Sequence, residues 1–338
     1  MGEFELLAKL RERLPQPSSR VKLGSGDDAA VTVPGGATAT SVDAIVDGVH
    51  FRRGESGLDS VGRKALATAL SDLAAMGAET GEAYVVLGAP PDLGEDDFLA
   101  LLDGMLGLAA ASGTTLAGGD VTRAPVLTVA VTVVGHAAAA EDFVTRGGAR
   151  AGDLLVLTGE IGAAAAGRLL LENPGLPKAV SAGEADRLRI RQLDPTPRLL
   201  SGRALAAAGA RAMIDLSDGL AADAGHLAEA SGVALAIDSD RLPLTAGVAE
   251  IADAAGQDAL ALAVSGGEDY ELLAALPADR LAAAAAAIEE AGETTLTEIG
   301  QVTAGEGVAI RLPGGASLEA AGYDHLASRQ DEGRSAAP

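Results

Sequence analysis

Six aspartates follow apolar, strand-like runs or sit in turns of Gly and Ser, and their placement constrains the fold more than any other feature. They are Asp28, Asp43, Asp72, Asp120, Asp215 and Asp218. Carboxylates that cluster repel one another and are costly to desolvate unless a cation lies among them. Mg²⁺ takes oxygen ligands, commonly a few carboxylates with waters and substrate phosphates. If the six side chains meet in space, the pattern favours magnesium-assisted handling of a polyphosphate.

Strand-like and helix-like segments alternate irregularly along the 338 residues, which predicts an α/β (α+β) protein with mixed sheets covered by helices. The length suggests two domains. We expect an N-terminal domain over 1–140, a C-terminal α/β domain over 141–327 and a disordered tail over 328–338. The predicted boundary near residue 140 falls among small and charged residues, and after it the strand-like and helix-like segments begin again.

Charge and composition argue against several classes of partner. The net charge of −23 disfavours nucleic acid and anionic membranes, since both need a basic surface. The absence of cysteine excludes disulfides, thiol catalysis and Cys-based zinc sites. No apolar run of about 18 residues predicts a membrane span, and no signal peptide is evident, so we expect a cytoplasmic protein.

Two stretches carry local structural expectations. A brief strand over 115–117 is expected to end at Gly118, which leaves Asp120 just beyond a Gly-Gly turn. Residues 173–184 are rich in Gly, Pro and Ser and predict a loop.

The segment Ser217-Asp218-Gly219 precedes a helix expected over 220–231 and is a plausible N-cap. Capping would explain Asp218 but not Asp215. A helix N-terminus also favours phosphate through its exposed N–H groups and its dipole. Both interpretations can hold together.

Three further features each have an ordinary and a functional interpretation. Gly24-Ser-Gly before Asp27 and Asp28 could be a simple tight turn, or a backbone open to phosphate beside a cation. A lone histidine is usually structural, but His50 follows a turn-like Asp-Gly and could reach a substrate phosphate. Arg146, in a loop with glycines, could be a surface charge or a planar fork for phosphate.

Neither the Gly-x4-Gly-Lys-Ser/Thr phosphate loop nor the protein-kinase motif set is present, so ATP would be bound through aspartates and metal ions. The strongest motifs are Ile214-Asp-Leu-Ser-Asp-Gly-Leu220 and Ser265-Gly-Gly-Glu-Asp-Tyr-Glu-Leu272. With Lys64-Ala-Leu-Ala, Gly118-Gly-Asp-Val-Thr-Arg123 and Gly322-Tyr-Asp-His325, they occur in an order that resembles the thiamine-monophosphate kinases. That family lies in the aminoimidazole-ribonucleotide-synthetase-like superfamily, and the resemblance covers nearly the whole chain.

The resemblance implies an enzyme that transfers the γ-phosphoryl group of ATP to thiamine monophosphate, giving thiamine diphosphate and ADP. It implies direct in-line transfer, which agrees with the lack of an evident nucleophile here. It also implies a two-domain fold whose N-terminal sheets pair across a homodimer.

The resemblance further implies a role for each matching residue. Several Mg²⁺ ions would be held by Asp28, Ser41, the Val42 carbonyl, Asp43, Asp72, Asp120, Asp215 and Asp218. ATP would contact Gly119, Asp120, Arg146 and Ser217, and thiamine monophosphate would contact His50, Glu268 and Tyr323. Asp120, Arg146 and Asp218 would be catalytic. Val42 departs from the Thr common in relatives, so a metal contact through that side chain is lost.

Two other functions stay open at this point. One is a different enzyme of the superfamily that activates an oxygen with ATP, such as an amide or selenide synthetase. A selenide enzyme would need a reactive Cys or selenocysteine, which this chain lacks. The other is a non-catalytic nucleotide- or metal-binding protein, which the presence of all six aspartates and Arg146 disfavours.

Overall fold

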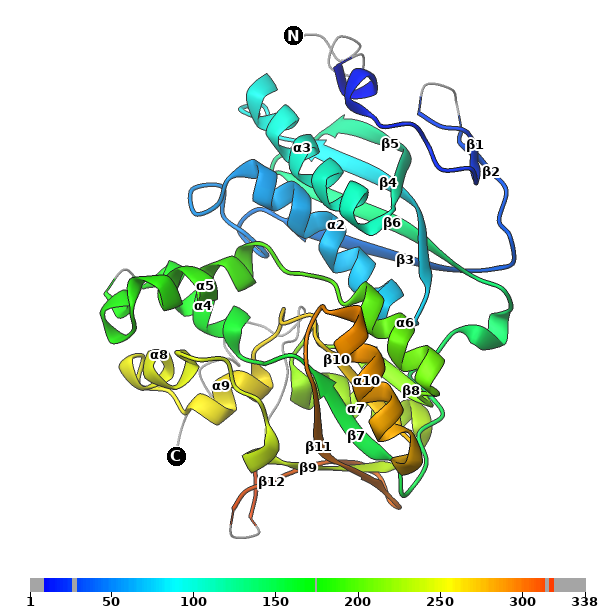
Figure 1. Cartoon of the computed structure of the whole chain (residues 1–338). Helices are drawn as coiled ribbons and strands as arrows, with labels where there is room; N and C mark the ends of the chain where they lie inside the picture. The colour runs from blue at the N-terminus through cyan, green and yellow to red at the C-terminus, as the bar shows by residue number, and fades with distance from the viewer. Residues whose placement is uncertain (1–8, 26–28, 174, 314–315, 319–338) are drawn as a thin grey trace.

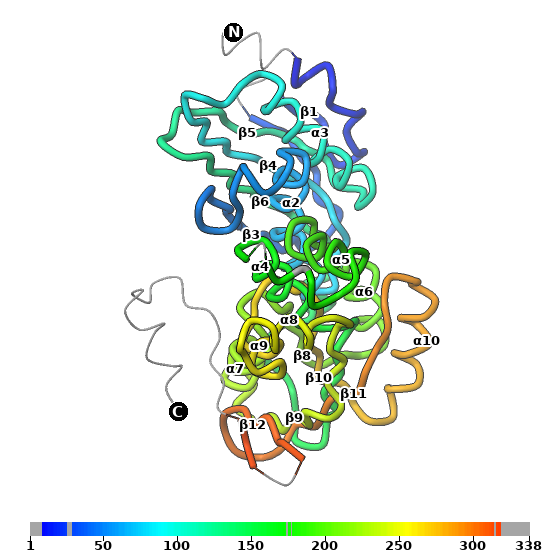
Figure 2. The backbone as a smooth tube through the Cα atoms, turned by 90° about the vertical axis from the view of Figure 1, so that its left-hand side faces the viewer, coloured from blue at the N-terminus to red at the C-terminus, as the bar shows by residue number. Residues whose placement is uncertain are grey.

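The computed structural model describes residues 9–25, 29–173, 175–313 and 316–318 (Figure 1). Their strands form two large sheets, one from each half of the chain, and a small β1–β2 pair near the N-terminus. In the turned view of Figure 2, one large sheet lies above the other, with α4 and α5 at the level between them.

The first half forms a four-stranded sheet in the order β3-β6-β4-β5, in which only the β4–β5 pair is parallel. Residues 9–13 are helical and lead into the small strand pair. The elements are β1 (Val21–Leu23), β2 (Val31–Thr32), β3 (Ala37–Val46), α2 (Leu58–Ala75), β4 (Glu79–Ala89), α3 (Glu95–Ser112), β5 (Thr115–Arg123), β6 (Thr128–Ala137) and η1 (Ala140–Asp142).

Alternation along β6 explains why helices cover only one face of this sheet. Val129, Val131 and Val133 are buried, whereas Ala130 and Thr132 between them are only half-buried. Successive side chains of a strand point to opposite faces, so one face carries the valines into a core shared with α2 and α3. The opposite face has no covering element among the described residues.

The second half forms a seven-stranded sheet in the order β13-β12-β9-β11-β7-β10-β8, in which only β12 and β9 pair in parallel. Its elements are β7 (Leu154–Thr158), α4 (Ala163–Glu172), η2 (Leu176–Ala179), α5 (Ala182–Leu193), α6 (Leu199–Ala208), β8 (Ala212–Asp215), α7 (Leu220–Ser231), β9 (Ala234–Asp238), η3 (Ser239–Arg241), α8 (Val248–Ala254), α9 (Ala259–Ser265), β10 (Leu272–Leu276), η4 (Ala278–Arg280), α10 (Leu281–Ala291), β11 (Leu296–Thr303), β12 (Gly307–Arg311) and β13 (Ser317–Leu318).

Helix α2 belongs to the cores of both halves. Its N-terminal two thirds pack on the first sheet, through side chains such as Leu66 and Leu70. Its last turn contributes Ala74 and Ala75 to a second core, which contains Leu205 of α6 and strand residues of the second sheet. Because α2 is covered on most sides, polar residues on it, such as Lys64 and Ser71, are buried as well.

The α/β (α+β) architecture of mixed sheets covered by helices, predicted from the sequence, is confirmed. The division of the chain near residue 140 stays a prediction, and the tail 328–338 lies outside the described residues. The strand expected over 115–117 is longer than predicted and continues to Arg123. It accommodates Gly118 because the register with β4 shifts there, so that Ala117 bulges out of the pairing.

The loop expected over 173–184 is also a misassignment, because it contains η2 and the start of α5. The Ser181 hydroxyl accepts from the Glu184 N–H, and the Glu184 carboxylate accepts from the Ser181 N–H. This reciprocal capping box is readable in the sequence as Ser-x-x-Glu, but the surrounding Gly and Pro residues outweighed it.

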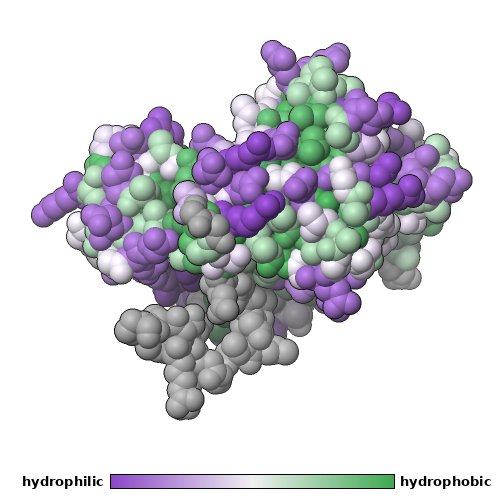
Figure 3. All heavy atoms as spheres, turned by 90° about the horizontal axis from the view of Figure 1, so that it is seen from below, coloured by the Kyte–Doolittle hydropathy of each residue, from purple (hydrophilic) through white to green (hydrophobic). Residues whose placement is uncertain are grey.

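Hydrophilic and apolar side chains intersperse on the face seen from below (Figure 3). Across the part of the chain that the structure describes, no helix is long and apolar enough to cross a membrane.

Candidate active site

Two consecutive residues near the end of α2 connect the two sheets. The Ser71 hydroxyl donates a hydrogen bond of 2.6 Å to the Asp215 carboxylate, at the end of β8. The next side chain, Asp72, accepts a hydrogen bond from the Ser41 hydroxyl on β3. A single turn of helix therefore brings an acid of the first half beside an acid of the second.

These acids lie close enough to perturb one another. Burial raises the pKa of Asp72, and the nearby charge of Asp43 raises it further. Burial also raises the pKa of Asp215 to about 7, with repulsion from Asp72 as the next cause. The serine hydrogen bonds and the positive charge of Arg146 act in the opposite direction on both groups. Asp43, Asp72, Asp215 and Arg146 thus lie near enough for their charges to interact, although they come from separate segments of the chain.

The turn between β8 and α7 differs from the predicted N-cap. Helix α7 starts after Gly219, whose φ of 108° favours glycine, and no side chain caps it. Instead, the Asp223 carboxylate accepts hydrogen bonds from the N–H groups of Asp218 (3.1 Å) and Gly219 (3.0 Å). Burial raises the pKa of Asp223 to about 8, and repulsion from Asp215 and Asp218 contributes. Asp223, which the sequence analysis missed, therefore shapes this turn.

The loop over 265–271 lies directly against that turn. The N–H of Glu268 donates to the Ser217 carbonyl and the N–H of Tyr270 to the Leu216 carbonyl, each at 2.9 Å. A Cβ atom on Gly267 would come within 2.3 Å of the Ser217 carbonyl oxygen, so glycine is required there. The two strongest sequence motifs are therefore neighbours in space.

Glu268 and Tyr270 have positive φ angles of 70° and 51°, a conformation that side chains other than glycine rarely adopt. Such strain is held only where the surroundings fix the backbone. The Tyr270 ring is buried, and burial raises its pKa. The charges of Glu268, Asp43, Asp215 and Asp72 raise that pKa as well, which places the ring beside the acid group described above.

The other two acids of this loop hold the second half together. Asp269 accepts hydrogen bonds from the N–H groups of Gly162 (2.7 Å) and Ala164 (3.1 Å) at the start of α4, and burial raises its pKa to about 6. Glu271 is fully buried and accepts from Arg198 and Thr158, each at 2.8 Å. The motif thus combines two structural acids with Glu268, whose side chain is partly exposed.

His50 closes a tight turn after β3. Its Nδ1 atom accepts a hydrogen bond of 3.1 Å from the Val46 N–H. The side chain of Lys64 donates to the His50 carbonyl oxygen at 3.1 Å and to the Glu268 carboxylate at 2.9 Å. Two residues assigned by resemblance to the same substrate therefore share one cation.

Asp120 does not join the acid group. It is exposed on β5, at the opposite edge of the sheet from β3. Three strand spacings of about 4.8 Å separate these edges, or about 14 Å. Asp28 and Tyr323, both predicted at the site, lie outside the described residues. Within the described ranges, no three His, Cys, Asp or Glu side chains form a group that could hold a metal ion.

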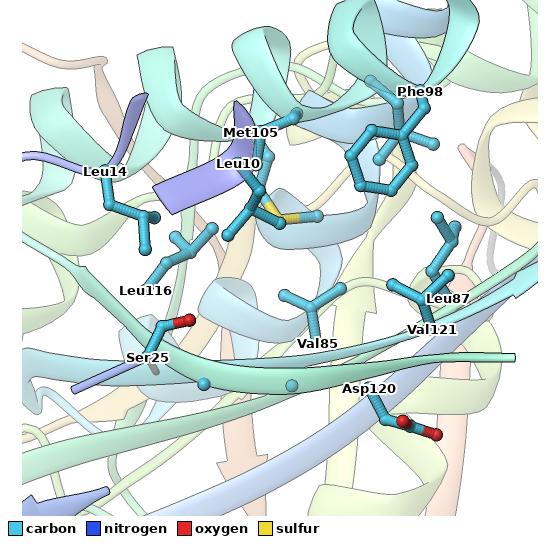
Figure 4. Close-up of a pocket in the computed structure, with 14 residues that line it drawn as sticks. Leu10, Leu14, Ser25, Val85, Leu87, Phe98, Met105, Leu116, Asp120 and Val121 are labelled. Carbon is cyan, nitrogen blue, oxygen red and sulfur yellow. The ribbon is translucent and has the colours of Figure 1, made fainter. Parts of the chain in front are cut away.

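An apolar cavity of about 90 Å³ lies between α3 and the β4–β5 edge of the sheet (Figure 4). Asp120 points away from it, on the other side of β5, while Val85 and Leu116 point into it. Nothing in the sequence indicates this cavity, because its residues have the spacing of an ordinary core. It is lined by Leu10, Leu14, Ser25, Val85, Leu87, Phe98, Leu101, Leu102, Met105, Leu116, Gly118, Gly119, Asp120 and Val121.

Both halves match models of one class of protein. Residues 26–137 match the AIR synthase related protein, N-terminal domain, and residues 150–313 the AIR synthase related protein, C-terminal domain. The fold and the site thus define an AIR synthase related protein. A thiamine-monophosphate kinase of Mycobacterium tuberculosis is 41% identical over 280 residues, covering 81% of this chain and 80% of that relative. The chain belongs to the thiamine-monophosphate kinase family.

Solved structures agree with this assignment. A thiamine-monophosphate kinase from Stenotrophomonas maltophilia superposes with a TM-score of 0.81 at 36% identity, over 94% of this chain and 98% of that one. AaThiL complexed with AMPPCP and TMP superposes with a TM-score of 0.75 at 31% identity, over 96% and 97%. The resemblance found in the sequence is confirmed.

Proposed function

We propose that the protein transfers the γ-phosphoryl group of ATP to the phosphate of thiamine monophosphate, forming thiamine diphosphate and ADP. The observation that carries the proposal is that Ser71 and Asp72 of α2 contact Asp215 and Ser41, which places the charges of Asp72 and Asp215 near each other between the two halves of the chain. Members of the family with this name match over most of the chain, and one of them has been solved with AMPPCP and TMP.

The carboxylate oxygens near the end of α2 are of the donor type that Mg²⁺ prefers, although the described residues of one chain do not group three of them closely enough to hold an ion. Asp215 is buried and Asp72 is partly buried. The pKa values of both carboxyls are raised by burial and by a neighbouring acid, and a cation among these groups would relieve the repulsion. We propose that Asp28, Ser41, the Val42 carbonyl, Asp43, Asp72, Asp120, Asp215 and Asp218 supply oxygen ligands. When bound, Mg²⁺ would neutralise charge on the phosphates.

The chain's own groups then have to orient two anions. The Arg146 guanidinium offers planar N–H pairs to phosphate oxygens, and Ser217 lies in the turn beside the acid group. An acceptor phosphate is already anionic, so it needs no strong general base. Positioning and neutralisation of charge would supply most of the rate enhancement. Asp120, Arg146 and Asp218 are the residues that we propose as catalytic.

We further propose that the site is completed by a second copy of the chain. The uncovered face of the first sheet carries Val42 and Val86, which are 67% and 47% exposed, beside Ala44, Ala130 and Thr132. A regular face of small and apolar side chains suits pairing with its own copy. If the β3 edge of one chain adjoins the β5 edge of the other, Asp120 of the partner subunit would lie toward the edge strand that carries Asp43. This pairing would resolve the separation of about 14 Å within one chain.

The apolar cavity is a candidate binding site for the base of the nucleotide. It adjoins Gly119 and Asp120 at the exposed edge of the sheet, so a nucleotide could cross that edge with its base in the cavity and its phosphates beyond. We propose that the adenine ring lies there, against Leu116 and Val121.

The test is an end-point assay of the purified protein with ATP, Mg²⁺ and thiamine monophosphate, resolved by chromatography. Thiamine and a no-acceptor sample are the controls. We expect thiamine diphosphate and ADP in equal amounts, and only with the monophosphate. Consumption of ATP without thiamine diphosphate would indicate a different acceptor. Nucleotide binding without any turnover would favour a non-catalytic binding protein.

A further inference from the structure

Lys64 is a buried cation, and two of its three acceptors belong to residues assigned by resemblance to thiamine monophosphate. It lies on α2 and is 1% exposed. Its ammonium group has three N–H donors, and three acceptors lie within hydrogen-bond distance. They are the Glu268 carboxylate at 2.9 Å, the Gln192 carbonyl oxygen at 3.0 Å and the His50 carbonyl oxygen at 3.1 Å. Each of the three N–H donors of Lys64 therefore has an acceptor.

The Glu268 carboxylate is fixed at both of its oxygens. Lys64 contacts one oxygen, and the Gln192 side-chain amide donates to the other. The Glu268 side chain nevertheless keeps 23% of its surface exposed, whereas the side chain of Lys64 keeps only 2% of its own. The cation therefore supports the carboxylate from the protein side, and each oxygen retains a lone pair for a donor outside.

Stability alone is a weak reason for this arrangement. A buried ammonium costs several kcal/mol to desolvate, and an apolar pair of similar volume is often equally stable. What the ion pair adds is a fixed, ionised acceptor at a chosen place. It also connects Glu268 of the second half to the His50 turn of the first half through a single atom, Nζ.

We infer that Lys64 is a positioning residue for the acceptor substrate. It fixes the positions of Glu268 and the His50 turn relative to each other, so that Glu268 and His50 can contact thiamine monophosphate together. The inference rests on the proposed function. Two acceptors of Lys64, Glu268 and the His50 carbonyl, belong to residues assigned to thiamine monophosphate, and none of its three acceptors is a proposed ATP ligand. Loss of Lys64 should therefore weaken the binding of thiamine monophosphate and leave the binding of ATP unchanged.

The neighbouring residue supplies a matched control. Arg63, also on α2, forms an ion pair with Asp194 just after α5, so it too connects α2 to the second half. The partner of Arg63 in this pair is neither Glu268 nor the His50 turn. If Lys64 only joined the two halves, Arg63→Met and Lys64→Met would have the same kinetic consequences.

The experiment measures the Michaelis constants for thiamine monophosphate and ATP in wild type, Lys64→Met, Arg63→Met and Glu268→Gln. For Lys64→Met we expect the constant for thiamine monophosphate to rise about tenfold or more, as for a lost charge-assisted contact. The constant for ATP should stay within about twofold, and Arg63→Met should change neither. The double variant Lys64→Met/Glu268→Gln should be no worse than the worse single variant, because both act through one carboxylate.

Gln192→Met provides a second route if Lys64→Met fails to fold. It removes the amide donor to Glu268 and leaves the ammonium paired, so we expect a smaller but equally selective rise. Equal changes for both substrates, or Lys64→Met behaving like Arg63→Met, would overturn the positioning role while the proposed function stands. A wild-type protein without thiamine diphosphate formation would overturn the proposed function, and the inference with it.

Discussion

At the residue scale, the acids of this chain divide into three kinds that sequence alone does not separate. Asp72 and Asp215 meet at a site, Asp269 and Asp223 order backbone turns, and Glu271 is held by arginines. All follow or precede glycines or apolar runs in the sequence. Only the partners in space distinguish them, since capping and metal binding both use carboxylate oxygens.

Motif matches in the sequence are sufficient to single out Asp43, Asp72, Asp215, Arg146 and Glu268. They could not identify Lys64 as a partner of Glu268, because 204 positions of chain separate the two residues. They also suggested for Asp218 a capping role, whereas Asp223 orders that turn. Local signals identify a residue type suited to a task, whereas long-range packing decides which residue performs it.

Asp269 gives a prediction for stability as a function of pH. Its pKa is about 6 in the folded protein, against an ordinary value of 3.8, so between these values the native state holds a proton that the unfolded chain has lost. The contribution of Asp269 to the free energy of unfolding therefore falls as pH rises from about 4 to about 6 and is then constant. Urea unfolding of wild type and Asp269→Asn should show a stability difference that shrinks over this range.

The matched control is Asp258→Asn, which alters the exposed N-cap of α9, where the carboxylate accepts from the Ala261 N–H at 2.8 Å. The same dependence on pH in both comparisons would contradict a special role of burial at Asp269.

At the element scale, β5 shows why a strand can be misjudged. Glycine weakens strands, so the Gly118-Gly119 pair predicted an end, yet β5 continues past it through a bulge. The bulged edge borders the apolar cavity on one side and Asp120 on the other. Helix α2 has a stripe of apolar residues in its sequence, which by itself suggests an amphipathic helix, yet it is buried on most sides.

Filling the apolar cavity should weaken the binding of ATP and leave the binding of thiamine monophosphate unchanged. We expect Val121→Trp to raise the Michaelis constant for ATP by about tenfold, since the added ring occupies the space proposed for adenine. Val126→Trp is the control, because Val126 is 42% exposed beyond the end of β5 and does not line the cavity. Unchanged ATP kinetics in a folded Val121→Trp protein would place the base elsewhere.

At the scale of the whole molecule, the question is whether one chain contains a complete site. The described chain places Asp43 and Asp215 near Asp72 and leaves Asp120 at the far sheet edge. No reasoning from the sequence of one chain could anticipate this, because the motifs carry no information on which copy supplies each ligand. A shared site makes a specific prediction for mixed dimers.

Asp120→Asn and Asp215→Asn should each reduce turnover by orders of magnitude. In a mixed dimer of one Asp120→Asn and one Asp215→Asn chain, purified through two different tags, one site would carry both defects and the other none. Such a dimer should recover about half of wild-type turnover. Asp72 and Asp215 belong to one chain's cluster, so a mixed dimer of Asp72→Asn and Asp215→Asn chains should stay inactive. Inactivity of both mixed dimers would refute a site shared through Asp120.

Helix α2 also bears on how such proteins diversify. The chain matches two family models in succession, which suggests modules that evolution could exchange. Yet α2 is encoded in the first and supplies side chains to the core of the second. A new second half would leave Ser71 and Lys64 buried without Asp215 and Glu268 as acceptors. Recombination at the apparent boundary is therefore penalised, and the two halves are expected to be inherited together.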